Sequence, residues 1–262
     1  MSTETRPQRR NMATDTLIVM TRELRPVISD PFSIVFGLVQ PLFFLLLFGP
    51  LVAGTIEDSG VQTSPWAWFV PGILVMTSLF GTAGTGSNLL FDLQSGAHER
   101  LLVTPLTRPS LFVGRALKEF APLLAQAVII IVVMVPFGFR PHLGGAVLGL
   151  LLLGVLGVGI GSLSYALAIA VRDQDWVFWT VHQTILFPLM ILSGMLLPLE
   201  NGPTWMRLLA NINPLTHVVE AERALFAGDI AATSVVFGFL AATATAALGL
   251  ILGLRSLKTS TN

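Results

Sequence analysis

Residues 143–171 read LGGAVLGLLLLGVLGVGIGSLSYALAIAV, a run without a single charged side chain. A helix of about 20 apolar residues crosses the roughly 30 Å hydrocarbon core of a bilayer. The run lacks the alternation of apolar and polar residues that builds a membrane β-barrel. It therefore predicts a membrane-spanning α-helix.

Five further apolar runs of similar length occur along the chain, each rich in Leu, Ala and Gly. The sequence therefore predicts an all-α integral membrane protein with six transmembrane helices, at Phe32–Val52, Trp66–Leu90, Leu111–Phe137, Leu143–Val171, Trp176–Leu197 and Ile230–Leu254. The predicted domain organisation is a cytoplasmic tail with an interfacial helix over 1–31, a transmembrane domain over 32–254 and a short cytoplasmic tail over 255–262.

The composition excludes several other classes of protein. Of the 262 residues, 53% are hydrophobic and only 11% are charged, whereas soluble domains carry about 25% charged residues. A soluble enzyme, a disordered chain and a nucleic-acid-binding protein are all disfavoured.

The chain contains no cysteine, and its four histidines are widely spaced. We therefore expect no disulfide, no thiolate chemistry and no metal site.

The chain also lacks the common sequence signatures of catalysis. Neither of its two lysines, Lys118 and Lys258, follows a glycine, so no phosphate-binding G-x-x-x-x-G-K-[ST] loop is present. No G-x-S-x-G elbow and no H-E-x-x-H helix occurs. We expect no catalytic residue in this chain.

The basic residues predict the orientation, because Lys and Arg accumulate on the cytoplasmic side of a membrane protein. If the N-terminus is cytoplasmic, twelve of the fifteen basic residues lie inside, and only Arg140, Arg207 and Arg223 lie outside. Both termini are therefore predicted to be cytoplasmic.

A stripe of apolar residues in the N-terminal segment recurs at helical spacing: Ala13, Leu17, Met20, Leu24 and Val27. The pattern favours an amphipathic helix that lies on the membrane surface. The alternative is a helix that packs its apolar stripe against the protein.

The longest predicted cytoplasmic loop runs over 91–110. Gly96 interrupts the preceding helix, and a short helix can form before Pro105 ends it. That helix carries the charged pair Glu99 and Arg100 beside Leu101 and Leu102. Charge next to a small apolar surface suits a docking element for a cytoplasmic partner, and a solvated loop is the alternative.

The predicted outer segment over 198–229 contains a helix too short to span the membrane. Asn213 and Pro214 are a strong helix start, and Gly228 provides the stop. We expect a re-entrant helical hairpin in the outer leaflet; a surface helix lying flat is the alternative. Glu222 falls on the apolar face of this helix, so we expect it to pair with Arg207 or to face a wet vestibule.

Polar side chains within the predicted spans are candidates for a transport pathway or for hydrogen bonds between helices. The pathway candidates are Gln40, Asn88, His182 and Gln183.

Taken together, several motifs resemble a known family. They comprise Asp30-Pro31 and Gln40-Pro41 near the first span, a loop motif and an outer motif. The loop motif consists of Gly96, Glu99, Arg100, Leu101, Leu102, Thr104, Pro105 and Arg108; the outer motif includes Asn213, Pro214, Leu215, Thr216, Glu220 and Arg223. With this spacing the chain resembles the membrane subunits of type-2 ABC transporters, in particular the daunorubicin-resistance type of drug exporter.

The resemblance implies a function and a set of partners. The chain would be the permease subunit of an ATP-driven exporter, acting as a homodimer or with a related permease in a bacterial plasma membrane. The loop motif would couple it to two cytoplasmic ATPase subunits, which would bind ATP and Mg. The cargo would be a lipophilic drug, a lipid or a related molecule. An integral membrane lipid-modifying enzyme and a secondary transporter are the rival hypotheses, although the sequence shows neither convergent acid–base groups nor internal repeats.

Overall fold

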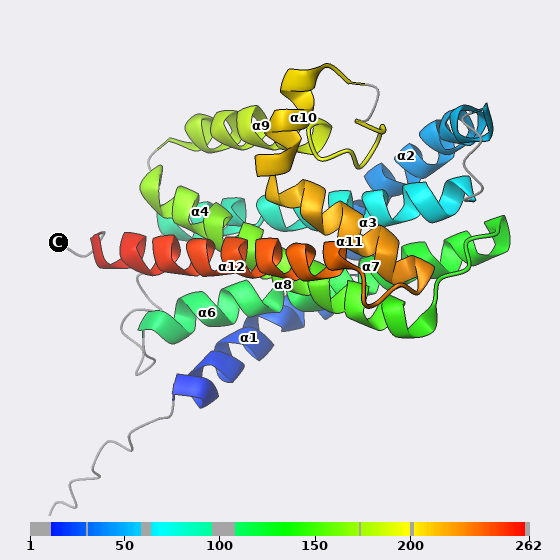
Figure 1. Cartoon of the computed structure of the whole chain (residues 1–262). Helices are drawn as coiled ribbons and strands as arrows, with labels where there is room; N and C mark the ends of the chain where they lie inside the picture. Colours follow the sequence, from blue (N-terminus) through cyan, green and yellow to red (C-terminus); the bar gives the residue numbers. More distant parts are fainter. Residues whose placement is uncertain are drawn as a thin grey trace, which may run out of the picture.

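The computed structural model describes residues 12–29, 31–58, 64–95, 108–172, 174–199 and 202–259 (Figure 1). Within these ranges every regular element is a helix, as the sequence predicts. The elements are α1 (Met12–Ser29), α2 (Pro31–Asp58), α3 (Pro65–Ala83), α4 (Gly86–Gln94), α6 (Arg108–Lys118), α7 (Phe120–Met134), the 3-10 turn η1 (Val135–Phe137), α8 (Leu143–Ala170), α9 (Asp175–Ile191), α10 (Thr204–Ile212), α11 (Pro214–Ala227) and α12 (Thr233–Thr259).

Helix α8, which comes from the uncharged run, is the centre of the bundle (Figure 1). It packs against α12, α3, α11, α4 and α7. The closest approach to α12 depends on glycine: a Cβ atom on Gly249 would lie 2.5 Å from the carbonyl oxygen of Gly159. Small residues that let two helix backbones meet are typical of membrane helix packing. The glycines of α8 and α12 therefore allow close packing between two helices of the same chain.

Four helical segments in the described part of the chain are long and apolar enough to cross a membrane: Pro65–Gln94, Pro109–Phe137, Leu143–Ala170 and Thr233–Ser256. They agree with four of the six predicted spans. The first predicted span lies entirely within α2, which covers Pro31–Asp58. The fifth is shorter than predicted, because the chain turns over 192–194 and α9 ends at Ile191, six residues before the predicted end of that span.

The second membrane segment is not one continuous helix, because α3 and α4 are separated by a turn at Gly84 and Thr85. Ser164 on α8 stabilises the break. Its hydroxyl accepts a hydrogen bond from the Gly86 amide at 2.9 Å and donates one to the carbonyl of Ala83. Backbone groups freed inside a membrane need such partners, so the neighbouring helix makes the interruption tolerable.

The third membrane segment is also interrupted, at Glu119 between α6 and α7. Pro122 lacks an amide hydrogen and cannot bond to the carbonyl four residues earlier, which belongs to Lys118. The break places Glu119, a buried charged residue, at the junction of two helices.

Helix α1 packs along α6, as Figure 1 shows at one end of the bundle. The side that faces the protein carries Asp15 and Val19, which are buried, and Val19 contacts Gly114 of α6. Leu17 of the predicted apolar stripe is 56% exposed. Met20, Leu24 and Val27 of the same stripe are half-buried. The stripe therefore lies beside the face that packs on α6, and both the interfacial and the packed interpretation remain predictions.

Candidate functional site

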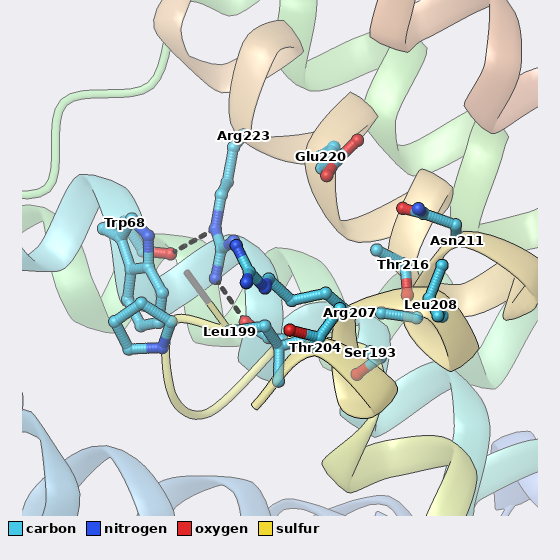
Figure 2. Close-up of a pocket in the computed structure, with 13 residues that line it drawn as sticks. Trp68, Ser193, Leu199, Thr204, Arg207, Leu208, Asn211, Thr216, Glu220 and Arg223 are labelled. Carbon is cyan, nitrogen blue, oxygen red and sulfur yellow. Dashed lines mark hydrogen bonds between the residues drawn. The ribbon is translucent and has the colours of Figure 1, made fainter. Parts of the chain in front are cut away.

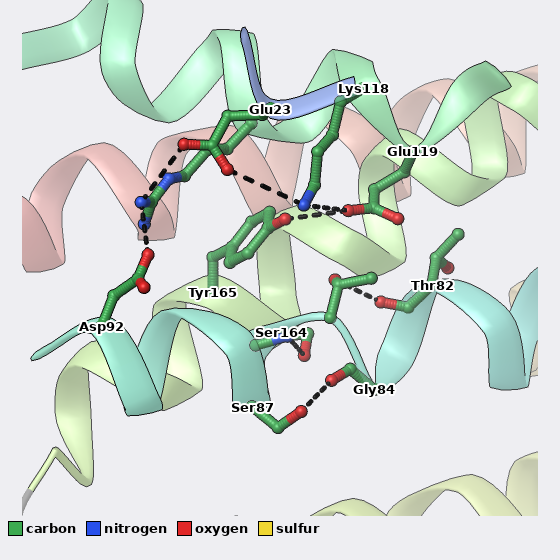
Figure 3. A network of polar contacts seen from close by, with 12 residues as sticks. Glu23, Thr82, Gly84, Ser87, Asp92, Lys118, Glu119, Ser164 and Tyr165 are labelled. Atoms are coloured by element: carbon green, nitrogen blue, oxygen red, sulfur yellow. Dashed lines mark hydrogen bonds and ion pairs between the residues drawn. The ribbon is translucent and has the colours of Figure 1, made fainter. Parts of the chain in front are cut away.

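A cluster of charged side chains joins the two flanks of the predicted coupling loop (Figure 3). Asp92 lies on α4, at the start of the predicted loop over 91–110, and Arg115 lies on α6, five residues after the end of that range. The Arg115 Nη2 atom donates to Asp92 Oδ2 at 2.7 Å and lies 3.5 Å from Glu23 Oε1 on α1. The Arg115 side chain is only 7% exposed. One buried guanidinium therefore connects three helices.

Lys118 and Glu119 extend the cluster toward the bundle core. The Lys118 Nζ atom lies 4.0 Å from Glu23 Oε2 and 3.7 Å from Glu119 Oε1. Tyr165 of α8 donates its hydroxyl hydrogen to Glu119 Oε1 at 2.9 Å. The hydrogen bond between Tyr165 and Glu119 thereby connects these ion pairs to the central helix α8. We call the set Glu23, Asp92, Arg115, Lys118, Glu119 and Tyr165 the inner polar cluster.

The predicted coupling residues themselves, from Gly96 through Pro105, lie outside the described part of the chain. Of that motif, only Arg108 falls within it, as the first residue of α6. The inner polar cluster was not predicted from the sequence. The one feature of the sequence that indicates this cluster is the three-residue spacing of Arg115 and Lys118, which puts two cations on one side of a helix.

The second helix of the outer segment, α11, begins where the sequence predicts. The Asn213 side-chain oxygen accepts a hydrogen bond from the Leu215 amide at 3.0 Å, and Pro214 is the first helical residue. The same Asn213 side chain donates through Nδ2 to the Leu189 carbonyl at 2.7 Å, which fixes α11 to the end of α9. Gly228 ends the helix with a φ of 93°, a left-handed conformation that favours glycine.

Helix α11 is not a solvated surface helix. It packs along α12, α8 and α3, and eight of its residues are buried. Its first turns meet α12 where Gly238 approaches Ala221 and the His217 carbonyl. The flat surface helix that the sequence left open is therefore disfavoured.

The prediction that Glu222 pairs with Arg207 is wrong. Glu222 is fully buried and points toward Gly149 of α8, and neither carboxylate oxygen has a hydrogen-bond partner among the described residues. Arg207 lies on α10 and lines a cavity on another side of α11. Burial raises the pKa of the Glu222 carboxyl from 4.5 to about 8. The helical pattern indicated correctly that Glu222 shares the apolar face, but it could not show which helix covers that face.

Arg223 is held firmly at the outer segment (Figure 2). Its Nε atom donates to the Trp68 carbonyl at 3.1 Å, and Nη2 donates to the Gly194 carbonyl at 2.9 Å. The guanidinium carbon also lies 3.9 Å from the centre of the Trp68 ring, within the range of a cation–π interaction. Arg223 therefore links α11 to the start of α3 and to the turn after α9.

The structure separates the four pathway candidates. Gln40, Asn88 and Gln183 are exposed on the single chain, whereas His182 is buried. The His182 ring packs 5.8 Å from Phe178 and 5.6 Å from Trp179. It lines an apolar cavity of about 320 Å³ whose walls come from α3, α8, α9, α11 and α12.

The described residues form a bundle of apolar helices in which one helix break carries the buried Glu119, and this arrangement is typical of an integral membrane protein. Comparison with known proteins identifies the family: residues 14–227 match the ABC-2 type transporter family. The chain belongs to that family and is a multi-pass ABC transporter permease.

Several relatives carry transport names. The chain is 26% identical to the daunorubicin resistance ABC transporter permease protein DrrB1 of Streptomyces coeruleorubidus, over 87% of this chain and 80% of the relative. It is 31% identical to the putative transport permease ycf38 of Pyropia yezoensis, over 79% of this chain and 72% of the relative. It is 25% identical to the probable multidrug ABC transporter permease YbhR of Escherichia coli K12, over 63% of this chain and 45% of the relative.

Proposed function

We propose that this permease is the membrane subunit of an exporter driven by a separate cytoplasmic ATPase. Two permease copies would form the pathway, and two ATPase subunits, which would bind ATP and Mg, would sit beneath them. The sequence contains no phosphate-binding loop of the kind described above, so a subunit with such a site must supply the energy. The family match over 14–227 is the observation that carries the proposal.

The inner polar cluster suggests how movement would pass from the ATPase to the membrane. Glu99 and Arg100 would contact the ATPase from the predicted coupling loop. Because Arg115 binds Asp92 on one flank of that loop and Glu23 on α1, displacement of the loop would move three helices together. The Glu119–Tyr165 hydrogen bond would transmit the movement to α8.

In the proposed topology six helices cross a plasma membrane and both termini are cytoplasmic. Helix α9, with 17 residues, is about 26 Å long at 1.5 Å per residue, so it would cross only a locally thinned bilayer or would depend on the turn that follows it. A reporter fused after Asn262 should remain in the cytoplasm. A cysteine introduced at Asp58 should react with an impermeant reagent added from outside.

In the same topology α10 and α11 form a re-entrant hairpin in the outer leaflet. The burial of α11 among α3, α8 and α12 favours this placement. Transported molecules would be lipophilic, since the cavity beside His182 is lined almost entirely by apolar side chains. Two relatives are named for drug resistance and multidrug transport, which supports a drug as cargo.

The proposal is tested by reconstituting the permease with its ATPase partner in liposomes and measuring ATP hydrolysis and cargo release. Replacement of Glu99 and Arg100 by alanine should reduce transport-coupled hydrolysis while membrane insertion and the thermal midpoint stay unchanged. The matched control replaces the exposed residues Asp229 and Arg140, which should have no effect. Wild-type coupling in the Glu99/Arg100 variant would refute the role assigned to the loop.

A further inference from the structure

A cavity of about 540 Å³ lies between α10, α11, the start of α3 and the turn after α9 (Figure 2). Its volume falls in the range typical of small-molecule sites, about 300–1,000 Å³. Its lining differs from that of the apolar cavity beside His182, because Arg207 and Arg223 both contribute side chains to it. Glu220 is the single acidic residue among the described lining residues.

The two arginines converge on the same space. Figure 2 shows the Arg207 side chain extending from α10 toward the guanidinium of Arg223. Like charges that share a cavity repel unless a group of opposite charge lies between them. Arg207 forms no ion pair with any described residue, whereas Arg223 is fixed by the Trp68 and Gly194 carbonyls. A fixed guanidinium beside a second one is a preorganised arrangement for an oxyanion.

Neutral donors and apolar side chains complete the lining. Thr204 and Asn211 from α10 supply a hydroxyl and an amide, which can donate hydrogen bonds to the same oxyanion. Leu199 and Leu208 give part of the wall an apolar character. The cavity therefore combines a cationic centre with an apolar wall, as a ligand with a charged head and an apolar body requires.

Helix α10 continues the apolar surface away from the cavity. Trp205 is 59% exposed, Leu209 46% and Ile212 80% on the single chain. In a membrane protein such a face lies against acyl chains, while Arg207 and Asn211 of the same helix face the cavity. A ligand with its anionic group between the arginines would thus have its apolar part next to the lipid-facing side of α10.

We propose that this cavity binds the phosphate group of an anionic amphiphile, such as the headgroup of phosphatidylglycerol. The site is distinct from the apolar cavity and from the inner polar cluster. Its assignment to the outer leaflet rests on the proposed topology, but binding itself requires neither the ATPase nor transport.

The test measures lipid retention by the full chain, purified in detergent without nucleotide or ATPase, using native mass spectrometry. Wild-type protein should retain phosphatidylglycerol in preference to phosphatidylcholine. Arg207→Gln should weaken phosphatidylglycerol binding about tenfold, the loss expected for one charge-assisted hydrogen bond, and Arg207→Lys should keep most of it. Arg140→Gln, which removes an exposed cation elsewhere, is the matched control and should bind as wild type does.

A second arm distinguishes a lipid from a free anion. Inorganic phosphate at millimolar concentration should compete only weakly with phosphatidylglycerol if the apolar wall contributes to binding. Complete displacement by inorganic phosphate would contradict the amphiphile assignment. Equal losses in the Arg207→Gln and Arg140→Gln variants, or no preference for the anionic lipid, would overturn the site. Because the assay contains no ATPase, these results are independent of any failure of coupled transport.

Discussion

Replacement of the buried Glu222 by glutamine should make the permease more stable at neutral pH. Its carboxylate oxygens lie against Gly149 without a hydrogen-bond partner among the described residues. An ionised carboxylate in that position is strongly disfavoured, and burial raises the pKa of Glu222 from 4.5 to about 8. The folded protein therefore holds a proton at Glu222 over a pH range in which the unfolded chain has released it.

The sign of the pH dependence follows from this difference in bound protons. As the pH rises from about 4.5 to about 8, the unfolded state loses the proton first, so the free energy of unfolding falls by about 1.4 kcal/mol per pH unit. At pH 7 the cumulative loss is about 3 kcal/mol. Above pH 8 the penalty no longer grows, and below pH 4.5 it is absent.

Glu222→Gln removes the titrating group and keeps nearly the same shape. We expect its thermal midpoint to exceed that of the wild type by roughly 6–12 °C at pH 7, at about 2–4 °C per kcal/mol for a chain of this size. The gain should shrink toward zero near pH 4.5. Thermal unfolding in detergent, followed at pH 5, 6, 7 and 8, measures both effects.

The matched control is Glu220→Gln, on the same helix but exposed. It removes an identical charge and should show no comparable pH-dependent gain. A midpoint for Glu222→Gln equal to or below that of the wild type at both pH 7 and pH 8 would refute the reasoning, because it would mean that the carboxylate is paired or hydrated.

Three further predictions concern the packing and the inner polar cluster. Arg115→Ala should lower stability by about 2–4 kcal/mol, since it leaves Asp92 and Glu23 without their shared cation, and a double-mutant cycle with Asp92→Asn should show coupling between the two sites. Tyr165→Phe should cost about 1–2 kcal/mol through the lost hydrogen bond to Glu119; an unchanged thermal midpoint would show that water replaces the hydroxyl. Gly249→Ala should lower the thermal midpoint because its Cβ would lie 2.5 Å from the Gly159 carbonyl oxygen, whereas Gly81→Ala, whose nearest neighbour is 3.8 Å away, should be tolerated.

Much of the fold follows from local sequence signals. The uncharged run at 143–171 becomes α8, and the Asn213-Pro214 start with the Gly228 stop defines α11 to the residue. These signals are local because hydropathy and helix capping depend on neighbouring residues. The glycines of the apolar runs allow close helix packing, and the partner of Gly249 is Gly159 of the same chain.

The features that the sequence could not reveal depend on tertiary contacts. Helical periodicity put Glu222 on an apolar face, but the covering helix is α8 rather than α10, so the predicted ion pair does not form. The inner polar cluster unites residues from 23 to 165, and no local pattern encodes that convergence. The turn at Gly84 is likewise stabilised by Ser164 from a distant part of the chain.

The most direct test of the proposed coupling uses the absence of cysteine from this chain. A single cysteine introduced by Arg100→Cys, in the predicted coupling loop, would be the only thiol of the permease available for cross-linking to the ATPase. The account predicts that Arg100→Cys cross-links to the ATPase in membranes, that nucleotide changes the yield, and that Asp229→Cys gives no such product. Efficient co-purification of the two subunits without any cross-link from Arg100→Cys, or a cross-link from Asp229→Cys instead, would contradict it.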